Sequence, residues 1–152
     1  MESTVKTLSG NPESPVLAVE HLSACFGDNV VFTDINFQVN KGEILVVVGE
    51  SGCGKSTLLK IMIGLQKPSA GSVIFQGMDI VSAREDQLNN YRQNIGVLFQ
   101  SSALFSSMRL KENIALPIQE YTNLDSGMIN MIIKMKLGMV NLAGYETVSY
   151  TH

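Results

Sequence analysis

The residues of this sequence that could do chemistry are concentrated in one glycine-rich segment, GESGCGKST, at positions 49–57. It satisfies the pattern G-x-x-x-x-G-K-[ST], in which a loop between a strand and a helix cradles phosphate. Glycine at 49, 52 and 54 lets the backbone turn tightly and point N–H groups inward, where phosphate oxygens replace water as acceptors. The unpaired N–H groups and the dipole of the following helix add to this preference for anions. The segment therefore predicts a nucleotide triphosphate site.

The polar side chains at the end of this segment have predicted roles. Lys55 reaches the β- and γ-phosphates as a point charge, Ser56 offers its hydroxyl to Mg²⁺, and Thr57 donates to the α-phosphate. In this interpretation the side chain of Cys53 is a spectator, and its backbone N–H contributes. The alternative is a structural turn with a surface lysine. The predicted nucleotide-binding residues of the segment are Gly49, Glu50, Ser51, Gly52, Cys53, Gly54, Lys55, Ser56 and Thr57.

The elements that must position this segment lie on either side of it. The run ILVVV at 44–48 has no polar alternation, which predicts a strand covered on both faces, as in a parallel sheet. After the segment, apolar residues at helical spacing predict a helix of about two to three turns that stops at Gly64. Upstream, β-rich pieces at 16–26 and 30–39 flank the turn signal Gly-Asp-Asn and predict an antiparallel hairpin.

Downstream of the predicted helix the pattern changes from strands to helices. Strands are expected at 73–75 and 95–99, with a polar helix or loop between them. From Ser101 onward strand signals end, and the segments 108–118 and 126–139 have helical spacing. The composition shift at this point predicts a boundary within the chain.

These patterns predict three parts. Residues 1–15 are rich in Ser, Thr, Asn, Gly and Pro and are expected to be a flexible lead-in outside the fold. Residues 16–100 form a nucleotide-binding core with an antiparallel β subdomain. Residues 101–152 form the start of a helical subdomain.

The composition excludes several classes of function. With 152 residues, 45% of them hydrophobic, the chain can build a core, so intrinsic disorder is not expected. The net charge is −3 and no run of Lys or Arg could follow a phosphate backbone, which argues against a nucleic-acid partner. Cys25 and Cys53 lack metal-ligand spacing and fit a reducing setting. No stretch is long enough to span a bilayer, so any membrane role is expected to be peripheral.

Taken in order, these motifs resemble the ATP-binding subunit of ABC transporters from Leu17 to about Ala143. The resemblance implies an α/β phosphate-loop ATPase fold, with an N-terminal antiparallel β subdomain, that binds ATP and Mg²⁺. It places Phe26 where the family stacks an aromatic side chain on adenine; a hairpin core residue is the alternative. Gln100 matches a glutamine that reaches Mg²⁺ and the attacking water; a polar strand end is the alternative. Ser56 and Gln100 are therefore the predicted metal-binding residues.

A finer resemblance begins at VLFQSSALFSSMRLKENIALPIQEYTNL and continues in KMKLGMVNLAG. These stretches are similar to the ATPases of bacterial Mla or MCE-type phospholipid and toluene-tolerance transport systems. The likeness implies a transmembrane permease, a second ATPase subunit and an MCE-domain lipid-binding protein as partners, at the cytoplasmic face of the inner membrane. Transport of a small solute or lipoprotein is the alternative. Ala103, Leu104 and Phe105 are expected either to receive a short helix of the membrane subunit or to be ordinary core.

The helix expected at 126–139 is unusually rich in methionine. Apolar positions spread widely around it predict burial on more than one side, either in the core or against a partner to which methionine adapts. One stripe comprises Met128, Met131, Ile132 and Met135, and beside it lie Ile129, Ile133 and Leu137.

The resemblance also implies motifs that this sequence does not contain. After Ala143 it reads GYETVSYTH, where the family has its Leu-Ser-Gly-Gly-Gln signature, and no later strand ends in Asp-Glu. His21 and His152 do not match the family's switch histidine. No catalytic residue can therefore be assigned. We interpret the chain as the N-terminal part of a longer subunit, without the C-terminal part of the fold and without turnover of its own. A non-catalytic nucleotide-binding fragment is a further hypothesis.

Overall fold

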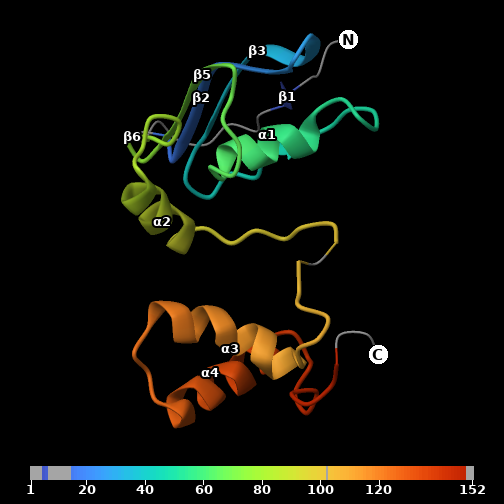
Figure 1. The fold of residues 1–152 in the computed structure, drawn as a ribbon, viewed down its shortest axis with the longest axis vertical. Helices are drawn as coiled ribbons and strands as arrows, with labels where there is room; N and C mark the ends of the chain where they lie inside the picture. The colour runs from blue at the N-terminus through green and yellow to red at the C-terminus, as the bar shows by residue number, and fades with distance from the viewer. Residues whose placement is uncertain (1–4, 7–14, 102, 150–152) are drawn as a thin grey trace. The chain divides into compact units, whose positions relative to one another are not determined.

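The computed structural model describes residues 5–6, 15–101 and 103–149. The chain forms two compact units, Met1–Gly96 and Val97–His152 (Figure 1). The elements of the first unit are β1 (Val5–Lys6), β2 (Leu17–Phe26), β3 (Asn29–Val39), β4 (Val46–Val47), α1 (Lys55–Met62), β5 (Ala70–Phe75), β6 (Met78–Asp79) and α2 (Glu85–Gln93). Those of the second are α3 (Leu110–Tyr121) and α4 (Ser126–Met139).

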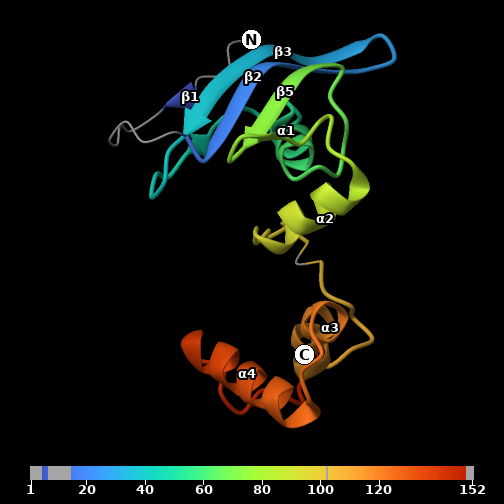
Figure 2. The same ribbon diagram turned by 90° about the vertical axis from the view of Figure 1, so that its left-hand side faces the viewer.

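A four-stranded antiparallel sheet forms the body of the first unit, with strand order β3-β2-β5-β6. The predicted hairpin is confirmed, because β2 pairs with β3 from Leu17↔Val39 to Phe26↔Asn29. Register shifts along this pair mark bulges, which bend the hairpin. Figure 2 shows the long hairpin strands side by side, with β5 next to β2.

Helix α1 packs on one face of this sheet. Its residues Leu58 and Ile61 are buried together with Val19 and Leu22 of β2 and Val73 of β5. Burial of side chains of this size is the main favourable term in folding, at about 1.5–3 kcal/mol each. The helix that follows the glycine-rich segment is therefore fixed to the sheet by its apolar side, and its N-terminus has a defined position within the unit.

Helix α2 is attached to the same core through Tyr91. The Tyr91 ring is buried and lies 4.8 Å from the ring of Phe75, centroid to centroid. Its hydroxyl donates a hydrogen bond of 2.7 Å to the carbonyl of Met62, in the last turn of α1. The tyrosine thus satisfies a carbonyl that the end of a helix leaves without an intrahelical partner.

Replacing Tyr91 with phenylalanine is expected to destabilise the first unit by about 1 kcal/mol, because the ring packing stays and the hydrogen bond to Met62 is lost. Urea unfolding of the two proteins measures the difference. Tyr121→Phe is the matched control, because Tyr121 is exposed. Equal losses in the two variants would contradict the assigned role.

The difference in stability between wild type and Tyr91→Phe is expected to depend on pH. Burial raises the pKa of Tyr91 above its ordinary value of 10.0. The unfolded state therefore loses this proton first, and the contribution to stability that is present below pH 10 is lost as pH rises toward the raised pKa. Because Tyr91→Phe cannot titrate, we expect the stability gap between the two proteins to shrink above pH 10.

The predicted strand at 44–48 differs from the expectation. Only Val46–Val47 is a strand, and it pairs antiparallel with β1 rather than lying inside a parallel sheet. Val47 packs on the core, but Ile44 is 78% exposed and Val48 is exposed as well. The prediction of a strand covered on both faces is therefore wrong for this structure. Leu45 and Val47 pack on the core, whereas the alternate residues Ile44, Val46 and Val48 are exposed, so only one face of this run is covered.

The strand predicted at 95–99 is also absent. These residues have no regular secondary structure, and Leu98 is 90% exposed. An apolar run becomes a strand only where a neighbouring strand accepts its backbone hydrogen bonds, and no described strand lies beside this run.

Part of the segment that we expected to be a flexible lead-in takes part in the fold. Residues 1–4 and 7–14 lie outside the described residues, whereas Val5–Lys6 pair with β4 in the register Val5↔Val47 and Lys6↔Val46. A backbone ladder therefore connects the start of the chain to the strand before the glycine-rich segment.

The second unit is built on two helices, α3 and α4, at the places that the apolar spacing predicts. Their contact buries Ala115 of α3 against Ile129, Ile133 and Leu137 of α4. The methionines of α4 point elsewhere, because Met128, Met131, Met135 and Met139 are all exposed. Among the described residues, the methionine side of this helix is therefore not buried, and the expected burial on more than one side is not met there. Among the described helices, none is long and apolar enough to cross a membrane.

Asp125 caps the N-terminus of α4, and its loss is expected to cost about 1 kcal/mol. Its Oδ1 accepts hydrogen bonds from the N–H groups of Gly127 at 2.8 Å and Met128 at 3.0 Å. Asp125→Ala removes both acceptors, whereas Asp125→Asn keeps the carbonyl oxygen and is the matched control. We expect circular dichroism melts to show a loss for alanine that asparagine largely avoids; equal melts would contradict the cap.

Candidate functional site

The glycine-rich segment 49–57 connects β4 to the start of α1. Gly52 has φ = 84° and Gly54, the residue before the helix, has φ = 98°. L residues with side chains rarely adopt this left-handed backbone region, so these two positions need glycine. The loop therefore has the tight turn that the sequence predicted, and α1 begins directly after it, at Lys55.

The N-terminus of α1 presents backbone N–H groups without partners. Within the described residues no hydrogen bond is recorded for the amides of Gly54, Lys55, Ser56 and Thr57, and no side chain caps the helix. The first turn holds no acidic residue. Unpaired donors and the positive end of the helix dipole point in the same direction, which favours an anion with several oxygens.

The Lys55 side chain folds back over the loop. Its Nζ donates to the carbonyl of Gly49 at 2.8 Å and to that of Glu50 at 2.7 Å, and it lies 3.6 Å from Sγ of Cys53. These contacts hold the ammonium group above the loop, beside the N-terminus of α1. An ammonium group has three donors, so it can exchange carbonyl acceptors for phosphate oxygens with little movement.

Cys53 contributes more to the structure of the loop than the spectator role that the sequence predicted for its side chain. Its N–H donates to the carbonyl of Glu50 at 3.3 Å, so this amide closes a turn inside the loop instead of remaining open. Its Sγ fills the space above Gly49, where an added Cβ would lie 2.6 Å from the sulfur. A side chain at position 49 would therefore have to displace the Cys53 sulfur, a contact that no spacing rule could have revealed.

Ser56 and Thr57 stand in the first turn of α1. Ser56 is exposed and Thr57 is half-buried, and neither hydroxyl has a recorded partner among the described residues. Both side chains are therefore available to a ligand bound at the helix N-terminus. An oxygen ligand of this kind suits Mg²⁺, which normally takes only one or two protein oxygens and binds phosphates and water with the rest.

The β2–β3 hairpin approaches the loop and carries Phe26. A Cβ added to Gly54 would meet Val31 at 2.6 Å and Phe32 at 3.1 Å, so β3 lies directly against the loop. Phe26 ends β2, pairs with Asn29 and is 51% exposed. This exposure rules out the alternative of a hairpin core residue and leaves the ring open to contact with a planar ligand.

Gln100 belongs to the second unit. It is exposed and lies in a turn, not at the end of a strand. The alternative of a polar strand end is therefore wrong, and the role of Gln100 toward Mg²⁺ stays a prediction.

A polar cluster on the hairpin was not singled out from the sequence. Nδ1 of His21 lies 2.8 Å from Oδ1 of Asp34, and the amide of Asn36 donates to the same oxygen at 3.0 Å. The hydrogen bonds with His21 and Asn36 lower the pKa of Asp34 below 3.8. Both His21 and Asp34 have positive φ, at 49° and 52°. The cluster holds a strained bulge in place, and only the register shifts, invisible in sequence, mark it.

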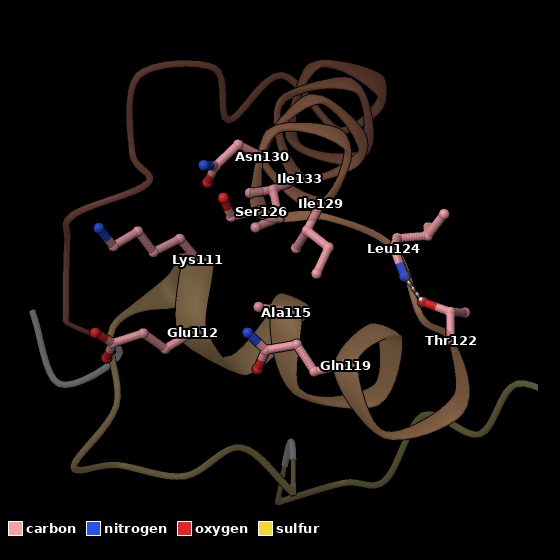
Figure 3. A pocket seen from close by; sticks show the side chains of 10 residues that line it. All are labelled: Lys111, Glu112, Ala115, Gln119, Thr122, Leu124, Ser126, Ile129, Asn130 and Ile133. Carbon is pink, nitrogen blue, oxygen red and sulfur yellow. Dashed lines mark hydrogen bonds between the residues drawn. The ribbon is translucent and has the colours of Figure 1, made fainter.

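The second unit contains a cleft of about 380 Å³ between α3 and α4. Figure 3 shows Ile129 and Ile133 of α4 on one side of it and Ala115 of α3 on the other, with Lys111 and Asn130 at its edge. The apolar floor belongs to the contact between the two helices. Lys111 is the one cation among the described residues that line the cleft.

Comparison with protein families decides the class of this chain. The family described as ABC transporter matches residues 32–150. The chain belongs to the ABC transporter family. This membership confirms the resemblance that the phosphate loop and its neighbouring motifs indicated.

Named relatives of this ABC family member include transport ATP-binding proteins of bacteria. The intermembrane phospholipid transport system ATP-binding protein MlaF of Haemophilus influenzae is 40% identical over 129 residues, covering 85% of this chain and 49% of the relative. MlaF of Escherichia coli K12 is 36% identical, covering 78% and 44%. The probable ribonucleotide transport ATP-binding protein mkl of Mycobacterium bovis is 39% identical, covering 90% and 38%. The chain therefore spans half or less of the length of these relatives.

Solved structures of ABC cassettes confirm the fold class. The bacterial ABC transporter cassette MJ0796, in a dimeric structure, matches with a TM-score of 0.74 and 26% identity, covering 88% of this chain and 61% of that one. A dimeric post-hydrolysis state of the same cassette, bound to ADP and Pi, matches with a TM-score of 0.77 and 23% identity, covering 89% and 62%. The predicted α/β phosphate-loop ATPase fold, in partial form, is thereby confirmed.

Proposed function

We propose that this chain is the nucleotide-binding part of an ABC transporter ATPase subunit, which binds Mg-ATP and couples it to transport through a membrane partner. The observation that carries the proposal is the loop itself: a row of unpaired amides at the start of α1, with the ammonium group of Lys55 held beside them. A triphosphate satisfies these donors and balances this charge in one step.

In this proposal each part of the site has one task. The backbone of the loop and Lys55 bind the phosphates, and Thr57 donates to the α-phosphate. Ser56 and Gln100 are the proposed ligands of Mg²⁺, which would neutralise part of the phosphate charge when bound. Phe26 stacks on the adenine ring. Residues 16–100 are the nucleotide-binding core in this assignment, and the helical subdomain starts at 101.

We infer phospholipid as the transported substrate. Support comes from the two MlaF proteins, whose names state intermembrane phospholipid transport, at 40% and 36% identity. The mkl relative, named for ribonucleotide transport at 39% identity, supports the alternative of a smaller solute. Neighbouring genes separate the two, because an MCE-domain lipid-binding protein supports lipid and a small-molecule binding protein does not.

The proposed partners follow from the same assignment. They are a transmembrane permease, a second ATPase subunit and an MCE-domain protein, with this subunit peripheral on the cytoplasmic face of the inner membrane. Ala103, Leu104 and Phe105 are exposed and irregular, which fits a surface for a short helix of the permease better than ordinary core.

Isothermal titration calorimetry with ATP tests the first step. We expect binding in the presence of Mg²⁺ and weaker binding when Mg²⁺ is chelated, because the metal neutralises part of the triphosphate charge. GTP is the control for base selectivity. We expect it to bind with an affinity similar to that of ATP, because a stacked ring distinguishes little between bases. Absence of any ATP binding would overturn the proposal.

Turnover is a separate question from binding. A non-catalytic nucleotide-binding fragment predicts Mg-ATP binding without release of phosphate. Steady phosphate release by the purified chain, abolished by Lys55→Ala, would rule that hypothesis out.

A further inference from the structure

The hairpin of β2 and β3 contains two adjacent bulges, one in each strand. Residues 20–21 of β2 lie opposite Asn36 alone, and residues 33–34 of β3 lie opposite Ser23 alone. The second shift cancels the first, so the register of the two strands is the same on both sides of the pair. Each bulge increases the local twist of a hairpin. The two bulges together therefore set the direction in which the end of the hairpin continues.

Three polar side chains, His21, Asp34 and Asn36, hold these bulges, and we call them the bulge lock. His21 and Asp34 are the bulged residues with positive φ. The N–H of His21 donates to Oδ1 of Asn36 at 2.7 Å, and the N–H of Asp34 donates to Oγ of Ser23 at 3.0 Å. Oδ1 of Asp34 in turn contacts His21 and Asn36 through their side chains. Side chains of the facing strand thus fix a backbone conformation that is otherwise unfavourable.

Strand β5 fits around the same bulges from the other side of β2. Gly71 has φ = 89°, and an added Cβ would collide with the carbonyl oxygen of His21. The N–H of Ser69 donates to the carbonyl of Ser23 at 2.8 Å, and Oγ of Ser69 accepts from the N–H of Cys25 at 2.8 Å. The bulges therefore have contacts on both neighbouring strands, which gives the bend of the hairpin one defined geometry.

The end of the hairpin beyond the bulges is the part that reaches the phosphate loop. There β3 carries Val31 and Phe32, whose side chains lie where a Cβ on Gly54 would be. On the paired strand, β2 ends at Phe26. The direction of the hairpin at the bulges therefore determines where the Phe26 ring lies relative to the loop.

We propose that the bulge lock positions Phe26 for contact with the nucleotide base, so that His21, Asp34 and Asn36 are positioning residues for ATP. They act through Phe26 rather than on the nucleotide. The inference rests on the proposed function, in which Phe26 stacks on adenine. Stacking depends on the distance and orientation of the two rings. A hairpin held in one geometry loses less conformational freedom when the base binds, and binding is correspondingly tighter.

The test compares two ligands of the full chain by isothermal titration calorimetry: Mg-ATP and inorganic tripolyphosphate with Mg²⁺, which has the phosphates but no base. Asp34→Gly removes the carboxylate of the lock without backbone strain, because glycine adopts positive φ freely. We expect its affinity for Mg-ATP to fall about threefold to fivefold, since the base contact is less ordered. The affinity for tripolyphosphate is expected to stay within about twofold, because the loop and α1 supply the phosphate donors.

Asp34→Asn is the matched control. It has the same charge as Asp34→Gly, but it keeps an oxygen acceptor for His21 and Asn36 and tolerates positive φ. We expect it to retain the wild-type affinity for Mg-ATP. Loss of a negative charge by itself would favour an anionic ligand, so charge does not explain a fall in affinity.

A double-mutant cycle separates positioning from simple stability. Phe26→Ala is expected to lower the affinity for Mg-ATP about tenfold, because base stacking is lost. In the Phe26→Ala background, Asp34→Gly is expected to cause no further loss, since the lock acts through the ring. Asn36→Ala breaks the lock at a second residue and is expected to behave in the same way. Thermal melts establish that each variant is folded at the temperature of the titration.

Several results would overturn the inference. They are unchanged affinity of Asp34→Gly and Asn36→Ala for Mg-ATP, equal losses for Mg-ATP and tripolyphosphate, or the same loss with and without the Phe26 ring. ATP binding that Phe26→Ala does not weaken would overturn the inference and the role of Phe26, but not the phosphate site. Absence of ATP binding by the wild type would overturn the proposed function, and this inference with it.

Discussion

Lys55→Ala is expected to weaken Mg-ATP binding about a hundredfold, because charge-assisted hydrogen bonds to phosphate contribute about 1.5–3 kcal/mol each. The structure holds Nζ of Lys55 within 2.8 Å of two loop carbonyls, so the charge is already in place before ligand arrives. No other lysine lies in the loop. Isothermal titration calorimetry on both proteins measures the loss.

Lys60→Ala is the matched control for this experiment. Lys60 lies in the last turn of the same helix, so its removal changes the net charge equally but leaves the phosphate loop intact. We expect its affinity for Mg-ATP to stay within about twofold, because an exposed charge at the far end of the helix is screened by salt. Equal affinities of wild type and Lys55→Ala would disprove the role of Lys55. A thermal melt of each variant separates lost binding from lost folding.

Gly54→Ala is expected to destabilise the first unit by about 2–4 kcal/mol, combining the cost of a left-handed alanine with overpacking. Gly54 has φ = 98°, and an added Cβ would lie 2.6 Å from Val31 and 3.1 Å from Phe32. Relief of these contacts must move either the hairpin or the start of α1. We therefore expect ATP affinity to fall together with stability.

Gly52→Ala separates the cost of a left-handed alanine from the cost of overpacking. Gly52 has φ = 84°, but an added Cβ would meet nothing within 4 Å, so only the backbone penalty of about 1–2 kcal/mol applies. Urea unfolding should therefore rank wild type above Gly52→Ala and Gly52→Ala above Gly54→Ala. If the two variants lost the same stability, the contact of the hairpin with the loop would not matter.

Local rules recover the elements whose partners lie nearby in the sequence. The hairpin at Gly27 forms because a turn joins two β-rich pieces that pair with each other directly. Helix α1 and helix α4 follow from apolar spacing and from their ends, such as the Asp125 cap. For these elements, the information needed to form them is contained within the segment itself.

The elements that failed depend on distant partners. The apolar runs at 44–48 and 95–99 have the same pattern. A run without polar alternation indicates only that burial of both of its faces would be favourable. Coverage of both faces needs packed layers on either side of the strand. Of the described residues in these runs, only Leu45, Val47 and Ile95 pack against the core. The pairing of Val5–Lys6 with β4 was invisible for the same reason, since two residues carry no period.

The candidate site was more predictable than the sheet around it. Gly54 and Lys55 stand at fixed positions of the pattern, so the pattern is enough to find them. The role of Cys53 in filling the space above Gly49, and the contact of β3 with Gly54, arise from packing in three dimensions. No one-dimensional rule specifies which side chain will fill a given gap.

The pairing of β2 with β5 has a consequence for how the molecule is made. Its register joins Leu17 to Phe75, so the hairpin, the phosphate loop and α1 all lie inside the segment that this pairing closes. Closure of so long a segment costs chain entropy before any contact rewards it, and topologies of this kind fold slowly. During synthesis, β5 emerges from the ribosome only after the hairpin, the phosphate loop and α1, which precede it in the chain. We therefore expect β2 to pair with β3 before it pairs with β5.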